Sequence, residues 1–260
     1  MNQIHKYPRT PHMAGSKLQI GDEDLKQIDF SLLAGRELVV EEKMDGANSA
    51  ISFDEDGRML LQSRGHYLTG GPREKQFDLL KGWANTVRDQ LWELMGSRYV
   101  VYGEWCYGKH TIFYNALPHY FLEFDILDLE KGQFLSTARR QAFLKDSPIV
   151  SVPVLAQRSF SSYDELVELV GQSTAIKGRH IEELRNWTSE NGQLVEQVVH
   201  ETDPTPLMEG LYLKIEDEEQ VIDRLKWVRA GFLQAVDASG SHWMNRPILP
   251  NWLAPGIKLF

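Results

Sequence analysis

Lys43 lies between a run of β-forming residues and an Asp-Gly dipeptide, in the segment ELVVEEKMDGANSAISF that spans residues 37–53. This composition predicts a strand, a turn at Asp45-Gly46 and a second strand. A lysine at a strand end, facing the turn, can be a covalent nucleophile if burial or nearby cations make its amine neutral. A solvated lysine at a turn would explain these few residues equally well, so the rest of the chain must decide.

Further motifs follow Lys43 in a fixed order. They are SRG with Arg64, VVYGEW with Glu104, YFLEFDILD with Phe121 to Asp125, EGLYLK with Glu209 to Lys214, and DRLKW with Arg224 and Lys226. Taken alone, each has an ordinary structural explanation, such as a strand-end carboxylate, a core aromatic residue, a turn cap or a solvated basic face. Their joint occurrence, in this order across residues 41–229, favours a functional interpretation.

The series resembles the collinear motifs of the covalent nucleotidyltransferases, the superfamily of DNA ligases, RNA ligases and mRNA capping enzymes. Motif I is KMDG, motif III ends in Gly-Glu, motif IIIa is the aromatic strand, motif IV is Glu-Gly and motif V is basic. Motif V departs from the pattern, because relatives often carry Lys-x-Lys where this chain has Arg224-Leu225-Lys226. Arginine keeps the charge but not the point geometry of an ammonium, so Lys226 is the expected phosphate ligand.

The resemblance implies that Lys43 attacks the α-phosphorus of ATP and forms a lysyl-AMP intermediate, with pyrophosphate leaving. It implies that Glu104 and Glu209 bind Mg²⁺ or Mn²⁺, directly or through water, and that Lys226 and Lys214 neutralise the phosphate. Asp45 would meet the ribose or the metal region. The expected catalytic residues are Lys43, Asp45, Glu104, Glu209 and Lys226. The expected nucleotide contacts are Glu42, which would read the base, Gly46, Asn48, Arg64, Phe121, which would stack on adenine, and Lys214.

Asn48 favours one branch of the superfamily. It lies five residues after Lys43, where nick-sealing RNA ligases carry asparagine and DNA ligases usually carry arginine or glutamine. We therefore expect an ATP-dependent RNA ligase that transfers AMP to a 5′-phosphate end and seals it to a 3′-OH. The alternatives are a DNA ligase-like or other nucleotidyltransferase, and a nucleotide-binding protein that keeps the fold without ligation. An unrelated hydrolase with Glu104 and Glu123 as paired carboxylates is a further alternative, with no other support.

The elements that must position these residues read as mixed strands and helices. We expect strand hairpins around Asp54–Gly57 and Lys131-Gly132, and a helix over 74–96 that ends at Gly96. Helices are also expected over 137–146, 162–171 and 176–200, the last broken near Asn191-Gly192, and strands over 98–108, 209–217 and 223–232. This mixture predicts an α+β nucleotidyltransferase fold, with antiparallel sheets flanked by helices. Only 34 residues follow Lys226, too few for a C-terminal OB-fold.

The chain is expected to divide into a nucleotidyltransferase domain over residues 1–232 and a wrapping tail over 233–260. The domain would include an N-terminal arm over 1–20, with Arg9, His12, Ser16 and Lys17 suited to phosphate, and a helical insertion over about 160–205. The arm could equally be solvated. The insertion could contact substrate or merely cover a sheet.

Composition limits the remaining classes. The chain of 260 residues is 42% hydrophobic and carries a net charge of −9, which opposes tight, non-specific binding of polyanions. No stretch approaches the ~20 apolar residues that span a bilayer, no signal peptide begins the chain, and one cysteine excludes an internal disulfide. We expect a cytoplasmic enzyme without membrane contact that acts on RNA ends or nicks. An end-processing partner protein would supply the further nucleic-acid-binding surface that this chain is expected to lack.

Overall fold

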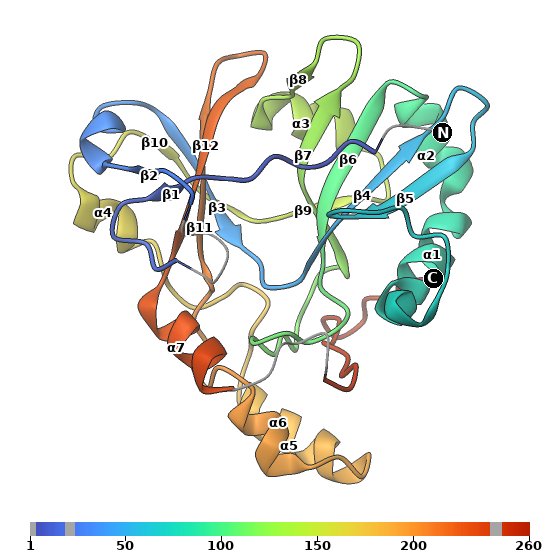
Figure 1. The fold of residues 1–260 in the computed structure, drawn as a ribbon, viewed down its shortest axis with the longest axis vertical. Coiled ribbons are helices and arrows are strands. Elements are labelled where there is room, and N and C mark those ends of the chain that lie inside the picture. The colour runs from blue at the N-terminus through green and yellow to red at the C-terminus, as the bar shows by residue number, and fades with distance from the viewer. Residues whose placement is uncertain (1–3, 19–23, 240–245) are drawn as a thin grey trace.

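The computed structural model describes residues 4–18, 24–239 and 246–260. Two mainly antiparallel sheets form the body of the protein, with helices outside them and at one end (Figure 1). This arrangement confirms the expected α+β class. Residues 1–3, 19 and 20 of the expected arm and 240–245 of the expected tail lie outside the described residues.

The first sheet has the strand order β10-β3-β11-β12-β1-β2. Its strands are β1 (His12–Met13), β2 (Gln27–Ile28), β3 (Leu38–Lys43), β10 (Val154–Arg158), β11 (Gly210–Glu216) and β12 (Val221–Val228). The second sheet has the order β5-β4-β6-β7-β8, with β9 paired to β7. Its strands are β4 (Ala47–Phe53), β5 (Met59–Ser63), β6 (Tyr99–Trp105), β7 (Phe121–Asp128), β8 (Gln133–Phe134) and β9 (Val150–Ser151).

The turn after Lys43 connects the two sheets. The sequence predicts a strand on each side of Asp45-Gly46, and both strands are present, but β3 pairs with β10 and β11 whereas β4 pairs with β5 and β6. The segment is therefore a crossing between sheets and no hairpin. The expected hairpin at Asp54–Gly57 does form, between β4 and β5.

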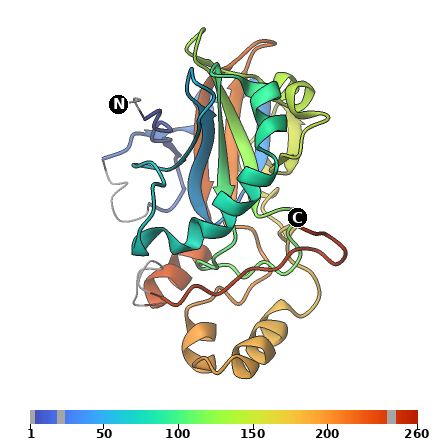
Figure 2. The ribbon, with the colours of Figure 1, turned by 90° about the vertical axis from the view of Figure 1, so that its right-hand side faces the viewer.

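Helices cover the second sheet on its outer face (Figure 2). The periodic segment 74–96 folds as three consecutive pieces, because a 3-10 helix gives way to an α-helix at Phe77 and the path breaks again at Val87. The segment ends at Gly96 with φ 51° as expected. Leu80, Trp83 and Leu91 pack on the strand residues Ile51 and Val101 in the largest core cluster. The helices are η1 (Phe30–Leu32), η2 (Pro72–Phe77), α1 (Asp78–Thr86), α2 (Arg88–Met95), α3 (Thr137–Leu144), α4 (Tyr163–Val167), α5 (His180–Glu190), α6 (Val195–His200) and α7 (Ala230–Ala238).

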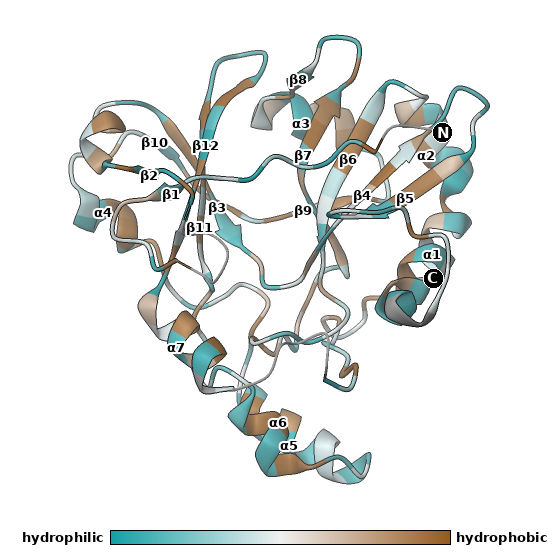
Figure 3. Cartoon of the chain, viewed as in Figure 1, coloured by the Kyte–Doolittle hydropathy of each residue, from teal (hydrophilic) through white to brown (hydrophobic). Residues whose placement is uncertain are grey.

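Hydrophobic residues concentrate in the long strands of both sheets, and the loops at the rim are more hydrophilic (Figure 3). One core cluster packs α1 and α2 on the second sheet, another packs α4 on the first sheet, and a third joins Tyr102 of the second sheet to Tyr212 of the first. Within the described ranges, no helix is long and apolar enough to cross a membrane.

The insertion and the C-terminal segment pack below the sheets. The segment 176–200 folds as α5 and α6, separated at Asn191-Gly192 as expected, and Leu184 and Val198 pack with Phe113 and Trp252. Residues 246–260 run along the loop after β6, where the Asn251 side chain donates to Cys106 O and accepts from Tyr114 N. The expected boundary at residue 232 falls inside α7, which continues to Ala238.

Buried charges join the two sheets. Arg140 of α3 pairs with Glu41 of β3, and also with Glu123 of β7 at 2.7 Å. Lys214 of β11 lies 3.0 Å from Glu41 and 3.4 Å from Asp125 of β7. All five side chains are at most 1% exposed, so removing one cation would leave uncompensated charge in the interior.

Replacing Arg140 by methionine should lower the free energy of unfolding by about 3–5 kcal/mol, the cost of breaking a buried ion pair from one side. Arg139, the neighbour on the same helix, pairs with Glu219 at a partly exposed site, and its replacement should cost under about 1 kcal/mol. Urea unfolding of both variants measures the difference. Equal losses would contradict the assignment of Arg140 as the link between the sheets.

Candidate active site

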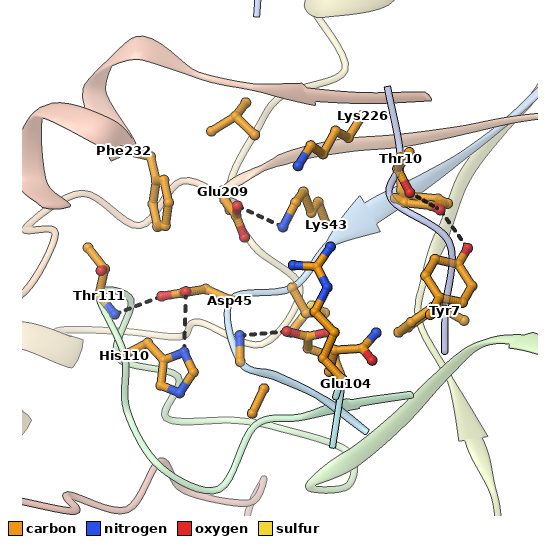
Figure 4. Close-up of a pocket in the computed structure, with 18 of the residues that line it drawn as sticks. Tyr7, Thr10, Lys43, Asp45, Glu104, His110, Thr111, Glu209, Lys226 and Phe232 are labelled. Carbon is orange, nitrogen blue, oxygen red and sulfur yellow. Dashed lines mark hydrogen bonds and ion pairs between the residues drawn. The ribbon is translucent and has the colours of Figure 1, made fainter. Parts of the chain in front are cut away.

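A cavity of about 910 Å³ lies between the two sheets at the point where β3 crosses into β4 (Figure 4). Its walls come from the ends of β3, β4, β6, β11 and β12, from the N-terminal arm and from α7. Nine of the eleven residues that the sequence predicts for the site line this cavity. They are Glu42, Lys43, Asp45, Gly46, Asn48, Arg64, Glu104, Glu209 and Lys226.

Lys43 is the last residue of β3, and its amine points into the cavity (Figure 4). The register of β3 and β11 sets Lys43 opposite Gly210, which brings Nζ to 2.7 Å from Oε1 of Glu209. Burial alone would lower the pKa of Lys43, but the carboxylates of Glu209 and Glu104 outweigh it and raise that pKa above its usual value. The carboxylates therefore stabilise the ammonium form of Lys43, and the amine needs a further influence that lowers its pKa before it can act as a nucleophile.

Glu104 and Glu209 approach the amine from different sheets. Burial and neighbouring carboxylates outweigh the attraction of Lys43, and together they raise the pKa of Glu104 to about 8 and that of Glu209 to about 7. No group of three or more His, Cys, Asp or Glu side chains suited to a metal occurs among the described residues. The two glutamates match the sparse protein ligand set of Mg²⁺, which usually takes one or two carboxylates and completes its shell with water and substrate phosphate.

The glycine of the KMDG motif is required by close packing. A Cβ on Gly46 would lie 2.7 Å from Trp105 O and 3.0 Å from Cγ of Glu104. The amide of Gly46 donates to Oε1 of Glu104 at 3.2 Å. Asn48 is paired directly across from Glu104 in β4 and β6. The turn therefore fixes the carboxylate that faces Lys43.

The carboxylates of Asp45 and Glu42 accept hydrogen bonds from neighbouring loops. Oδ2 of Asp45 accepts from the amides of Thr111 and Ile112 at 2.8 and 2.7 Å. Glu42 accepts from the hydroxyl of Ser173, and from the amide and hydroxyl of Thr174 at 3.1 and 2.9 Å. Both residues line the cavity, and both hold a neighbouring loop against it.

Lys226 and Arg224 lie in different surroundings, and Lys226 is the one at the cavity, as the comparison with motif V predicts. Lys226 lines the cavity, and its amide donates to Pro11 O of the arm at 2.9 Å. The guanidinium of Arg224 instead lies 3.9 Å from the ring centroid of Phe134 and 3.8 Å from Asp125. It packs outside the cavity wall.

Two predicted nucleotide contacts lie elsewhere. Phe121 is fully buried, stacks on Trp83 across the helix-covered face of the second sheet and fills the space above Gly103. It cannot reach a nucleotide in the cavity, and Phe124 is the aromatic residue of β7 that lines the wall. Lys214 is also fully buried, held by Glu41, Asp125 and the carbonyl of Phe124. Its charge is used between the sheets rather than on a phosphate.

The structure adds lining residues that the motifs did not indicate. Tyr7 and Thr10 of the arm, Phe124, His110, Tyr212, Phe232 of α7 and Arg246 all face the cavity. Of the arm residues expected to contact phosphate, Arg9 pairs with Asp24, and His12 bonds to Ser16, whose hydroxyl accepts from the amide of Val228. His12 and Ser16 thereby seat the arm on β12. No sequence signal separates Thr10 from its neighbours.

Two mainly antiparallel sheets with helices outside them, and a lysine-containing cavity between them, match the nucleotidyltransferase fold. The sequence model of the RNA ligase family matches residues 36–228. The chain belongs to the RNA ligase family. A comparison with curated proteins gave no significant match.

Solved structures of RNA ligase share the fold. A mutant of the Naegleria gruberi RNA ligase with ATP and Mn superposes with a TM-score of 0.52 at 16% identity, covering 80% of this chain and 54% of the ligase. An apo form of another mutant gives 0.53 at 15%, covering 82% and 54%. A third, with AMP and Mn, gives 0.51 at 16%, covering 79% and 53%. The chain thus spans about half the length of these structures.

Proposed function

We propose that the protein is an ATP-dependent RNA ligase that forms a covalent lysyl-AMP intermediate on Lys43. It then transfers AMP to a 5′-phosphate end and seals that end to a 3′-OH. The observation that carries the proposal is the Lys43 amine inside the cavity, 2.7 Å from Glu209 and beside Glu104 and Lys226. The family membership and the ATP in the Naegleria gruberi structure support it.

The residues of this chain supply binding, orientation and charge. Lys226 on β12 lies beside Lys43 at the cavity wall, where it can neutralise an α-phosphate (Figure 4). Nucleotidyl transfer depends on such positioning and charge stabilisation more than on acid–base chemistry. The Lys43 amine must lose a proton before it attacks phosphorus, and Glu209, in direct contact with Nζ, is placed to accept it. The N–P bond then forms as the P–O bond to pyrophosphate breaks.

Glu104 and Glu209 would hold a divalent cation, Mg²⁺ or Mn²⁺, together with phosphate oxygens. Two buried carboxylates that carry raised pKa values gain from a cation that compensates their charge. When bound, the metal would polarise the phosphate and lower the pKa of Lys43. The manganese in structures of the Naegleria gruberi ligase supports a divalent metal here.

Covalent labelling tests the central step. Incubated with α-labelled ATP and Mg²⁺ or Mn²⁺ and then denatured, the protein should retain AMP on Lys43, located by peptide mass spectrometry. Lys43→Ala and Lys43→Arg should both abolish labelling, because neither side chain offers an attacking amine at neutral pH. The exposed Lys177 provides the control, since Lys177→Ala should label normally. AMP on another residue, or reversible ATP binding without labelling, would refute the proposal and leave the nucleotide-binding alternative.

The strand preference separates the RNA ligase from the DNA ligase alternative. The 2′-OH is the group by which a protein tells RNA from DNA, and Asn48 with the family membership favours RNA. Nicked duplexes with ribose on the 3′-OH side of the nick should be sealed at least about tenfold faster than all-DNA nicks, the equivalent of about one good hydrogen bond. Gel assays under single turnover measure this ratio. Equal rates on all-DNA nicks would favour the DNA ligase alternative.

A further inference from the structure

The N-terminal arm brings a chain of hydroxyl groups to one end of the cavity. Tyr7 donates to Oδ2 of Asp125 at 2.5 Å. The hydroxyls of Tyr7 and Tyr212 lie 2.6 Å apart, and those of Tyr212 and Thr10 lie 3.0 Å apart. Asp125 is fully buried, whereas Tyr7, Tyr212 and Thr10 line the cavity (Figure 4).

The direction of every hydrogen bond in this chain is fixed by Asp125. Its carboxylate is flanked by Lys214 at 3.4 Å and Arg224 at 3.8 Å, so it remains an acceptor. A hydroxyl has a single proton to donate. Because Tyr7 gives its proton to Asp125, Tyr212 must donate to Tyr7, and Thr10 must donate to Tyr212. Burial raises the pKa of both tyrosines, which keeps the phenols protonated and the chain intact.

This polarity determines what Thr10 offers a ligand. Its one proton is used on Tyr212, so toward the cavity the Thr10 oxygen can only accept a hydrogen bond. Asp125 lies at the buried end of the chain of hydroxyls. Lys214 and Arg224, which face each other on the paired strands β11 and β12, flank its carboxylate and fix its orientation. The Thr10 oxygen therefore faces the cavity as a hydrogen-bond acceptor that cannot become a donor. A ligand oxygen that also only accepts would be repelled there.

The arrangement around Lys43 indicates which part of a nucleotide reaches Thr10. In Figure 4, Tyr7 and Thr10 lie on one side of Lys43, and His110 and Thr111 lie on the other. The first side is aromatic, with the rings of Phe124 and Tyr212 6.2 Å apart. The second side contains Arg246, whose guanidinium donates to His110 O, together with the carboxylate of Asp45 and the ring of Phe232. With the α-phosphate at Lys43, Arg246 suits a terminal phosphate, and the base suits the aromatic side, where two rings lie together.

We propose that Thr10 is a specificity-determining residue, which selects an adenine base by accepting a hydrogen bond from its exocyclic amino group. A hypoxanthine or guanine base places a carbonyl oxygen at that position, and the polarised hydroxyl chain rejects it. The inference rests on the proposed function, because it assumes that the base of the reacting nucleotide occupies the aromatic side.

Direct binding of ATP and ITP tests this selection, since the two nucleotides differ in the amino and carbonyl groups at one ring position. Calorimetry is performed in the Lys43→Ala background, where no covalent step can contribute. ATP should bind at least about tenfold more tightly than ITP, the equivalent of about one hydrogen bond. Thr10→Val removes the acceptor and should bring the two affinities within about threefold of each other.

Tyr212→Phe gives the sharper result. It leaves Thr10 in place but frees its proton, so the hydroxyl can rotate and donate to a carbonyl. ITP should then bind more tightly than before and ATP less tightly, and the preference should shrink or invert. Tyr120→Phe removes a phenol that donates to Asn251 O outside the cavity, and should preserve the preference. The ratio of two affinities in one sample is insensitive to a fraction of misfolded protein.

The outcomes distinguish this inference from the proposed function. Equal affinities for ATP and ITP in the Lys43→Ala protein, or an unchanged preference in both Thr10→Val and Tyr212→Phe, would overturn the role of Thr10. Covalent labelling of the parent protein would still support ligation in that case. A protein that selects ATP as described but never forms lysyl-AMP would keep this inference and lose the proposed chemistry. Binding of neither nucleotide would overturn this inference, and it would overturn the proposed function as well if the parent protein also failed to retain AMP.

Discussion

One ammonium, that of Lys43, compensates two buried carboxylates that arrive from opposite sheets. Glu104 comes from β6 of the second sheet, and Glu209 directly precedes β11 of the first. Their pKa values are raised because burial and the nearby carboxylate of Asp45 disfavour a negative charge on either side chain. Both carboxylates therefore gain from a ligand that brings a cation close to them.

Holding these groups together requires the two sheets to stay at a fixed spacing. The crossing from β3 to β4 carries Lys43 and places Gly46 against Glu104 with no room for a side chain. Above it, Arg140 and Lys214 pair with carboxylates of both sheets. Buried ion pairs are weak sources of net stability but costly to break from one side. They suit a role in fixing the relative position of the sheets.

The motif residues that could be predicted from the sequence are those tied to a backbone feature. Lys43 precedes an Asp-Gly turn, Glu104 follows a glycine and Glu209 precedes one, so type and spacing were informative even without a structure. Lys226 could be separated from Arg224 because only one of them fits the geometry of an ammonium on phosphate. The α+β class followed from the alternation of strand and helix periods.

The misassigned residues depended on which face of a strand a side chain occupies. On β7, Phe124 faces the cavity whereas Phe121 faces the core. The pairing of β6 with β7 also shifts register between Tyr102 and Gly103, which simple alternation along the strand does not predict. Lys214 finds its carboxylates on strands far away in the chain, which local pattern cannot reveal. The same holds for the arm, where Tyr7 meets partners more than a hundred residues distant.

Titration of the Lys43 amine tests the central claim that its surrounding carboxylates govern its charge. NMR of protein with labelled lysine side chains, assigned with Lys43→Arg, follows this amine with and without Mg²⁺ and ATP. In the metal-free protein we expect a pKa above the ordinary lysine value of about 10.4, so the amine stays charged at neutral pH. Glu209→Gln should lower it, and so should Mg²⁺ with ATP. A Lys43 pKa below that of ordinary lysines in the metal-free protein, or one indifferent to Glu209, would contradict the claim.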